Sequence, residues 1–463
     1  MRALLFLSIG LALASAAPAF AAAETPAPSD DHPLLRQIAG EVSADELHGV
    51  IARLVAFGTR HTLSDTTSDT RGIGAARRWV KTRFEAIGRD CGGCLQIVTP
   101  SQVVTGERVP QPTEVMDVLA IQPGTGDPNR VVIISGHLDS RVTDPMNATS
   151  DAPGANDDGS GVSAVLESAR ILSRHSYPAT IVYAVLSGEE QNLYGGRILA
   201  AYARAQGWNV EAQLNNDIVG NIHGINGVVD NTHVRVFSEG TKAVETPEQA
   251  NRRRYNGGEV DSPSRNLARF VDGLAGRYLS NFEVRMIYRT DRYSRGGDQV
   301  ALLEAGFPAV RLTEATENYT RQHQDVRTDG GVAYGDVIEG VDFPYLAQVT
   351  RLNAVALAAL ASAPAPPGDV KIAGAVSPDT TLSWTPSPGA AGYDVWRRDT
   401  TQPRWQFRRW AGPATRLTLK DVTIDDWFFG VSSVSADGYE SPVEFPGPAG
   451  AFVSPPPAAL PTK

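Results

Sequence analysis

The chain has 463 residues, of which 42% are hydrophobic and 20% are charged, and its formal net charge is −10. This length exceeds that of one typical domain, so we expect two folded units. The acidic balance argues against nucleic acid or an anionic membrane surface as a partner. The composition is otherwise that of an ordinary globular protein.

The first segment of the chain has the pattern of a signal peptide. Arg2 precedes an apolar run at residues 3–13, and small residues continue to Ala21. This order of a charged start, a short apolar core and a small-residue cleavage site predicts export and removal of residues 1–21. No apolar run is long enough to cross a bilayer as a helix, so we expect no membrane span. No cysteine follows the cleavage site, and we therefore expect a periplasmic or extracellular protein without a lipid anchor.

The next segment changes from polar to helical. Residues 22–33 are rich in Ala, Pro, Ser and Asp, and we expect them to be disordered. Apolar residues then recur at helical spacing over 34–85, with a polar loop at 62–70 between two helices. Both cysteines lie in Cys91-Gly-Gly-Cys94, and a local disulfide is the expected state in an exported chain.

Strands and helices alternate in the middle of the chain. The runs at 131–134 and 181–186 are continuously apolar and rich in β-branched residues, which is typical of buried parallel strands. Further strands are predicted at 212–216 and 309–312, and helices at 161–173, 194–205 and 349–360. This alternation predicts an α/β domain over residues 34–362, with helices on both faces of its sheet.

The residue composition and the apolar pattern of the sequence change after a Pro-rich linker at 363–368. Residues 369–452 contain short, aromatic-rich, alternating segments broken by Pro, Gly and Asp-Gly turns, which predicts an antiparallel β-sandwich. The early Trp384, the Tyr393-Asp-Val strand and the late Gly-Val-Ser-Ser-Val strand resemble a fibronectin type III module. The Pro-rich tail at 453–463 is expected to be loose.

Acidic and histidine residues follow three of the predicted strands. In chain order they are His137 and Asp139, Glu189 and Glu190, and Asp217. In open α/β sheets, ligands bind at the carboxyl ends of the strands. We therefore expect these side chains to converge although they are distant in sequence.

These residue types predict a two-metal centre. Oxygen and imidazole ligands without thiolates suit zinc, with manganese or cobalt as competitors. We expect one ion between His137 and Asp217, and a second between Glu190 and His323. Asp157 lies in a Gly-rich turn at the start of a predicted helix, and its short carboxylate is expected to bridge both ions.

Two further carboxylates are expected to take part in catalysis without binding a metal ion. We expect Asp139 to orient the imidazole of His137. Glu189 remains free beside the ions, where it would take a proton from the attacking water and later pass it to the leaving amine. Tyr319 is a candidate donor to the oxyanion, and Asp298 is expected to fix a loop.

The order of these segments resembles the peptidase family M28 of zinc aminopeptidases, over roughly residues 35–362. The matching segments are Ser-Gly-His-Leu-Asp at 135–139, Pro-Gly-Ala-Asn-Asp-Asp-Gly-Ser-Gly at 153–161, Ser-Gly-Glu-Glu at 187–190, Asn216-Asp217 and His323. The resemblance implies a three-layer α/β/α, phosphorylase/hydrolase-like fold with a mixed, largely parallel sheet. It also implies two zinc ions, the same ligands and base, and the N-termini of peptides or proteins as substrates. The chain departs from the family at Gly297-Asp298-Gln299, where Ser-Asp-His is usual, and at Gln324-Asp325 after His323.

Other functions share parts of this pattern. A glutaminyl cyclase of related fold binds one metal, so metal stoichiometry separates it from the aminopeptidase. A two-zinc carboxypeptidase or deacylase normally carries a dimerisation insert and a Gly-x-x-Asp-x-Lys-Gly motif, and this chain has neither. A non-catalytic binding protein, with the β-sandwich as its working part, is opposed by the presence of all six chemical residues. We therefore expect an exported zinc aminopeptidase, whose oligomeric state has no signature in the sequence.

Overall fold

The centre of the protein is an eight-stranded sheet, seen in a computed structural model that describes residues 26–452. Its strands follow the order β1-β4-β6-β5-β7-β10-β8-β9. The pairs β6–β5, β5–β7, β7–β10 and β8–β9 are parallel, whereas β1–β4, β4–β6 and β10–β8 are antiparallel. The bounds are β1 Gln96–Val98, β4 Val118–Gln122, β5 Arg130–His137, β6 Thr180–Leu186, β7 Asn209–Asn216, β8 His233–Phe237, β9 Glu283–Ile287 and β10 Ala309–Glu314.

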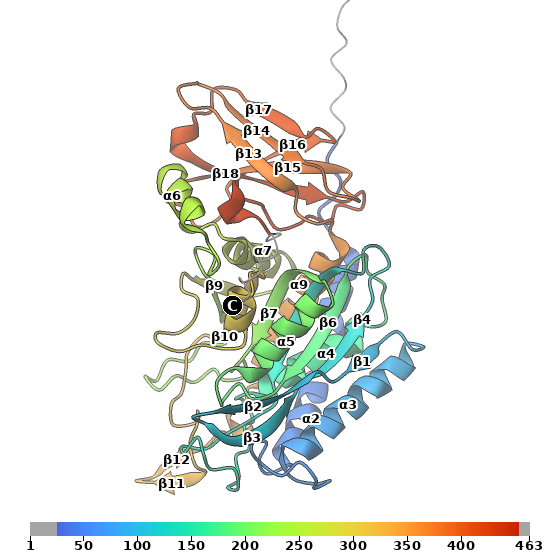
Figure 1. The fold of residues 1–463 in the computed structure, drawn as a ribbon, viewed down its shortest axis with the longest axis vertical. Coiled ribbons are helices and arrows are strands. Elements are labelled where there is room, and N and C mark those ends of the chain that lie inside the picture. The colour runs from blue at the N-terminus through green and yellow to red at the C-terminus, as the bar shows by residue number, and fades with distance from the viewer. Residues whose placement is uncertain (1–25, 453–463) are drawn as a thin grey trace, which may run out of the picture.

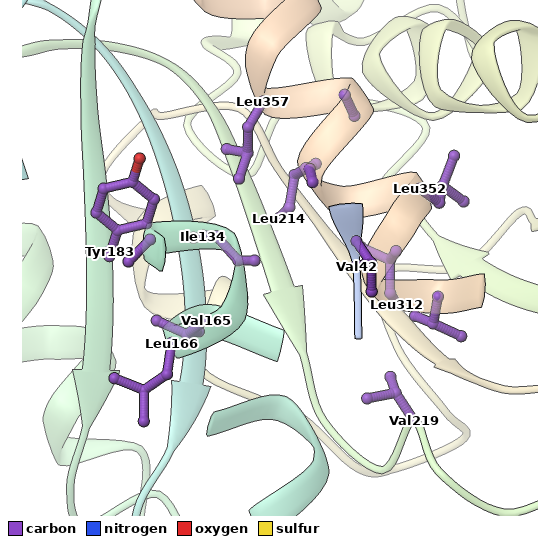
Figure 2. Close-up of a cluster of buried hydrophobic side chains, with 14 of the residues drawn as sticks. Val42, Ile134, Val165, Leu166, Tyr183, Leu214, Val219, Leu312, Leu352 and Leu357 are labelled. Atoms are coloured by element: carbon purple, nitrogen blue, oxygen red, sulfur yellow. The ribbon is translucent and has the colours of Figure 1, made fainter. Parts of the chain in front are cut away.

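Helices cover both faces of this sheet. One face packs against α1 (Pro33–Glu41), α2 (Ala44–Val55), α3 (Gly72–Asp90), α4 (Gly159–Leu172), α7 (Pro263–Tyr278) and α9 (Phe343–Ser362). The other packs against α5 (Tyr194–Ala205) and α8 (Gln299–Glu304). Figure 2 shows Ile134, Leu214 and Leu357 in the core between the strands and α9. The expected three-layer α/β/α fold, with a mixed sheet of mostly parallel central strands, is confirmed.

The N-terminal part differs in detail from the expectation. Three helices are present instead of two, because the chain is extended at Val42 and Ser43. The hydroxyl of Ser43 then accepts a hydrogen bond from the main-chain nitrogen of Glu46 and caps α2. Residues 29–32, part of the segment expected to be disordered, lie against the folded chain, where the ring of His32 stacks on Tyr439 with the centroids 3.9 Å apart. The expected Cys91–Cys94 disulfide is confirmed.

Smaller elements complete the first domain. A hairpin of β2 (Ser101–Gly106) and β3 (Val109–Met116), a helix α6 (Pro247–Asn256), and a pair formed by β11 (Arg327–Asp329) and β12 (Val332–Tyr334) lie outside the main sheet. The expected signal peptide at 1–21 and the tail at 453–463 lie outside the described residues. Among the residues that are described, no helix is long and apolar enough to cross a membrane.

The C-terminal part consists of two antiparallel three-stranded sheets, as expected. One contains β13 (Gly368–Ala373), β14 (Thr380–Thr385) and β17 (Arg416–Leu419), and the other contains β16 (Phe407–Gly412), β15 (Gly392–Asp399) and β18 (Trp427–Val434). Their shared core includes the rings of Trp384 and Tyr393, whose centroids are 5.4 Å apart. Figure 1 shows these sheets, in orange and red, beside α6 and α7 of the first domain.

A buried ion-pair cluster joins the two parts. The carboxylate of Asp261, just before α7, accepts hydrogen bonds at 2.8 and 2.7 Å from Nη2 of Arg398 on β15. It also accepts one at 2.9 Å from Nη1 of Arg269 on α7. All three side chains are at most 3% exposed. Buried charges of this kind are stable only while they remain paired.

We predict that Arg398→Met lowers the free energy of unfolding by about 2–3 kcal/mol, because it leaves buried Asp261 with one cationic partner. The matched control is Arg404→Met, which removes a more exposed ion pair with Asp272 across the same interface and is expected to cost less than about 1 kcal/mol. Urea unfolding of both variants checks the difference. Equal losses of stability would contradict the importance assigned to Arg398.

A second prediction concerns pH. Burial raises the pKa of Glu444 from its ordinary 4.5 to about 8, although the N–H of Phe452 and the ammonium group of Lys242 lower it. The folded state therefore binds this proton more tightly than the unfolded state. The resulting stability is fully present below pH 4.5 and is lost as the pH rises through about 8. In Glu444→Gln we expect this loss, on the order of 3 kcal/mol, to be absent from unfolding curves compared at about pH 5 and about pH 9. Parallel pH profiles for the two proteins would contradict the prediction.

Candidate metal centre

Three adjacent strands deliver the predicted residues to one edge of the sheet. His137 is the last residue of β5, the Glu189-Glu190 turn follows β6, and Asp217 comes directly after β7. Because β6, β5 and β7 are neighbours and parallel, their carboxyl ends lie side by side. Asp157 is supplied by the loop before α4 and His323 by the loop after β10.

These side chains form two groups of donors that share one residue. His137, Asp157 and Asp217 form the first group, and Asp157, Glu190 and His323 form the second; within each group the donor atoms all lie within 4.8 Å of one another. Nε2 of His137 is 3.1 Å from Oδ1 of Asp157, and Nε2 of His323 is 2.9 Å from Oδ2 of the same carboxylate. The two oxygens of Asp157 thus face different imidazoles, which is the arrangement that a bridging ligand requires.

The spacing of the donors fits zinc. Donors held about 2.0–2.1 Å from a tetrahedral ion lie about 3.3 Å apart. The separations between imidazole and carboxylate donors here run from 2.9 Å, between Nε2 of His323 and Oε1 of Glu190, to 3.9 Å, between Nε2 of His137 and Oδ1 of Asp217. Nε2 of His137 and Oε1 of Glu190 are also buried without a hydrogen-bond partner among the described residues. Buried polar atoms are normally satisfied, and one cation in each donor group would satisfy these two atoms.

The electrostatics of the centre reflect its concentration of carboxylates. Burial alone lowers the pKa of His323, but the carboxylates of Glu190 and Asp157 raise it to about 10. Burial raises the pKa of Glu189 well above its usual range, and the carboxylates of Asp217 and Glu190 contribute in the same direction. The raised pKa of His323 reflects the carboxylates that surround it, and a bound cation would offset their negative charge.

The loop that carries Asp157 is held from two sides. The carboxylate of Asp336 accepts hydrogen bonds from the main-chain nitrogens of Asn156 and Asp157, the latter at 2.7 Å. The next residue, Asp158, caps α4 by accepting from the nitrogen of Gly161 at 2.8 Å, and it also accepts from the nitrogen of His137 at 2.9 Å. The carboxylate at 157 is therefore left free to face the two histidines.

Asp139 is placed at the site but contacts different groups from those expected. Nδ1 of His137 donates to the main-chain oxygen of Asp139 at 3.0 Å, while the nearer carboxylate oxygen lies 3.7 Å away. The carboxylate instead accepts hydrogen bonds from the main-chain nitrogens of Gly188, Glu189 and Glu190 at 2.8, 3.2 and 3.1 Å. The imidazole is oriented mainly by the backbone of Asp139, and the side chain organises the turn that carries both glutamates.

Two arginines, the partly buried Arg141 and the buried Arg311, contact the donors and were not anticipated from the sequence. Nε of Arg141 donates to Glu190 at 2.8 Å, and its Nη2 lies 2.6 Å from Nδ1 of His323. Nη2 of Arg311 lies 2.8 Å from Oδ1 of Asp217. A signal for Arg311 exists, because it interrupts the apolar run at 309–312 and a charge in a buried strand needs an internal partner. Arg141 has no comparable signal.

A cleft of about 540 Å³ opens over these residues. Its lining includes Glu189, which is half-buried, together with donors from both groups. Tyr319 is 55% exposed and is not among the residues that line the cleft, so the structure does not bring it to the site. Asp298 accepts a hydrogen bond from the nitrogen of Gly196 at 2.9 Å and fixes its loop to α5, as expected.

An α/β/α fold with two such donor groups at the ends of its strands has the chemistry of a metal-dependent enzyme. The model of peptidase family M28 matches residues 117–329. A probable zinc metalloprotease from Leptosphaeria maculans is 42% identical over 427 residues, which cover 91% of this chain and 98% of the relative. Another from Pyricularia oryzae is 43% identical over 425 residues, covering 89% and 84% of the two chains. The chain belongs to peptidase family M28.

Solved structures show the same fold at lower identity. LapA from Legionella pneumophila is 18% identical, with a TM-score of 0.52, and the match covers 73% of this chain and 79% of that one. LapB from the same organism is 17% identical, with a TM-score of 0.51, and covers 71% and 75%. These matches span most of both chains, so the first domain here has the architecture of those proteins.

Proposed function

We propose that this protein is an exported aminopeptidase that uses two zinc ions to hydrolyse the first peptide bond of a peptide or protein. The observation that carries the proposal is the pair of donor groups that share Asp157, beside a glutamate that belongs to neither. Membership of the family and the names of the relatives, probable zinc metalloproteases, support zinc as the metal.

The proposed roles of the side chains follow from their positions. His137, Asp157 and Asp217 would hold one ion, and Asp157, Glu190 and His323 the other. Zinc bound there would polarise the scissile carbonyl and acidify the attacking water. Glu189 lines the cleft without being a donor in either group, so its carboxylate is free to accept the proton of that water. The same group would then return the proton to the leaving amine.

Hydrolysis of amino-acid p-nitroanilides tests the proposal. We expect turnover by the zinc-loaded protein, loss of turnover after chelation, and recovery when zinc is added back. A substrate with an acetylated N-terminus should resist cleavage, because an aminopeptidase acts at a free amine. Cleavage of the acetylated peptide from its C-terminus would instead indicate a carboxypeptidase. One zinc per chain together with release of pyroglutamyl peptides would indicate a cyclase, and full zinc loading without turnover would indicate a binding protein.

Export and the second domain complete the proposal. The Cys91–Cys94 disulfide supports an oxidising compartment, and the sequence pattern of residues 1–21 supports a signal peptide. The two antiparallel sheets formed by β13 to β18 support a fibronectin type III-like module over residues 369–452. In this proposal the linker at 363–368 joins the module to a peptidase domain at 34–362.

A further inference from the structure

The lining of the cleft is rich in arginine. Four arginines line it: Arg108, Arg141, Arg292 and Arg295. Arg141 is committed to the donors, because it contacts Glu190 and His323. The other three belong to the hairpin of β2 and β3 and to the loop between β9 and α8. We call these three, Arg108, Arg292 and Arg295, the arginine wall.

The carboxylates behind this wall are too few to neutralise it. Glu317 faces three guanidinium groups, those of Arg235 at 2.7 Å, Arg295 at 3.1 Å and Arg292 at 3.7 Å. Asp291 also contacts Arg292, but it is shared with Arg311, which is itself bound to a metal-donor carboxylate. The wall therefore keeps an excess of positive charge.

The individual arginines have unused hydrogen-bonding capacity. The side chain of Arg292 is only 9% exposed, and its Nη1 is buried without a hydrogen-bond partner among the described residues. The side chain of Arg295 is 34% exposed at the surface of the cleft. Arg108 donates to the main-chain oxygen of Glu190 at 3.0 Å. Because a main-chain oxygen has no formal charge, this contact does not neutralise the guanidinium group.

The acidic residues of the cleft are engaged elsewhere. Four of the carboxylates that line it, those of Asp157, Glu189, Glu190 and Asp217, are the expected metal donors and base. The fifth is Glu107 at the tip of the hairpin, where it is exposed. Once cations balance the donors, the cleft presents a net positive wall to a substrate.

We propose that the arginine wall binds a carboxylate of the substrate close to the scissile bond, and so selects acidic peptides. This inference rests on the proposed function and names its substrate class. Guanidinium groups pair with carboxylates through two parallel hydrogen bonds, which supplies both affinity and orientation. The carboxylate can come from an acidic side chain on either side of the bond or from the C-terminus of a dipeptide.

Matched substrate pairs distinguish these sources. Glu-p-nitroanilide against Gln-p-nitroanilide tests the residue before the bond, and Ala-Glu-amide against Ala-Gln-amide tests the residue after it. Ala-Gln against Ala-Gln-amide tests the free C-terminus. We expect at least one acidic partner to be favoured by roughly tenfold or more in kcat/KM, mostly through KM. The preference should shrink at high salt, because part of the wall is exposed.

Variants of Arg295 connect the preference to the wall. Arg295→Gln should raise KM for the acidic substrate and so bring the ratio of kcat/KM between the acidic and the neutral substrate towards one. Arg295→Lys should keep part of this preference. Arg292→Gln should act in the same direction. The control is Arg36→Gln on α1, an exposed arginine paired with Asp31 outside the cleft, and it should change nothing. The inference would be overturned if the unaltered protein gave kcat/KM ratios near one for all three substrate pairs. It would also be overturned if the preference were unchanged in both glutamine variants.

Binding separates this inference from the proposed function. Calorimetric titration of the zinc-loaded Glu189→Gln variant, which lacks the proposed base, with Ala-Glu-amide and Ala-Gln-amide measures the binding preference with turnover suppressed, and the unaltered zinc-loaded protein is assayed for turnover of the same amides. Tighter binding of the acidic amide, together with no turnover by the unaltered protein, would support the wall and reject the aminopeptidase. Turnover of neutral peptides together with equal binding of the two amides would reject the wall and leave the aminopeptidase standing.

Discussion

Glu189→Gln is expected to lower kcat by roughly 10²- to 10⁴-fold, the usual contribution of a general base. Glutamine keeps the shape of the side chain but cannot accept the proton of the attacking water. The metal content should stay unchanged, because Glu189 belongs to neither donor group. The measurements are kcat on a p-nitroanilide substrate and zinc per chain by elemental analysis.

Glu107→Gln is the matched control for this variant, since Glu107 is an exposed glutamate that lines the same cleft. We expect Glu107→Gln to leave kcat unchanged. That result would exclude a general effect of losing one negative charge in the cleft. Full turnover by Glu189→Gln would show that another group accepts the proton. Loss of zinc from that variant would show that Glu189 is a ligand.

Asp157→Ala is expected to reduce both zinc content and activity more than any other single ligand change. Asp157 is the only residue common to both donor groups, and its two oxygens lie 3.1 and 2.9 Å from the two imidazoles. Its removal deprives both ions of a ligand and leaves His137 and His323 without the carboxylate that they share. We expect less than about one zinc per chain after dialysis, and turnover near background.

Variants of one group alone provide the comparison. Asp217→Ala affects only the first group and His323→Ala only the second, so each should retain about one zinc per chain if the groups bind separately. Circular dichroism and thermal unfolding establish that each variant is folded. If Asp157→Ala still bound two ions per chain, the bridging role would be wrong.

The fold was largely predictable because its central strands are buried on both faces. The apolar runs at 131–134 and 181–186 lie within β5 and β6, and the helix expected at 194–205 is α5. Elements with mixed composition were harder to predict. The hairpin of β2 and β3, which brings Arg108 to the cleft, has polar and exposed residues along most of both strands, and such a pattern does not distinguish a strand from a loop.

The candidate site was predictable for a related reason. His137, Glu189 and Glu190 follow strongly apolar strands, Asp217 follows the strand predicted at 212–216, and parallel strands bring their carboxyl ends together. The partners of these residues were not predictable. Asp139 was expected to contact His137 through its carboxylate, but a main-chain oxygen makes the shorter contact, and sequence spacing cannot choose between two acceptors of one residue.

The sequence by itself determined the α/β order of the first domain, the antiparallel character of the second, and the residue types that gather at the ends of the strands. These properties depend on local periodicity and on polar residues placed at strand ends, which are readable along the chain. Only the tertiary structure decided that Arg141 and Arg311 contact the donors, that three arginines share Glu317, and that Arg398 reaches Asp261 from the other domain. The partner of a charged side chain depends on which distant segments pack together, and a single sequence does not show which segments are close in space.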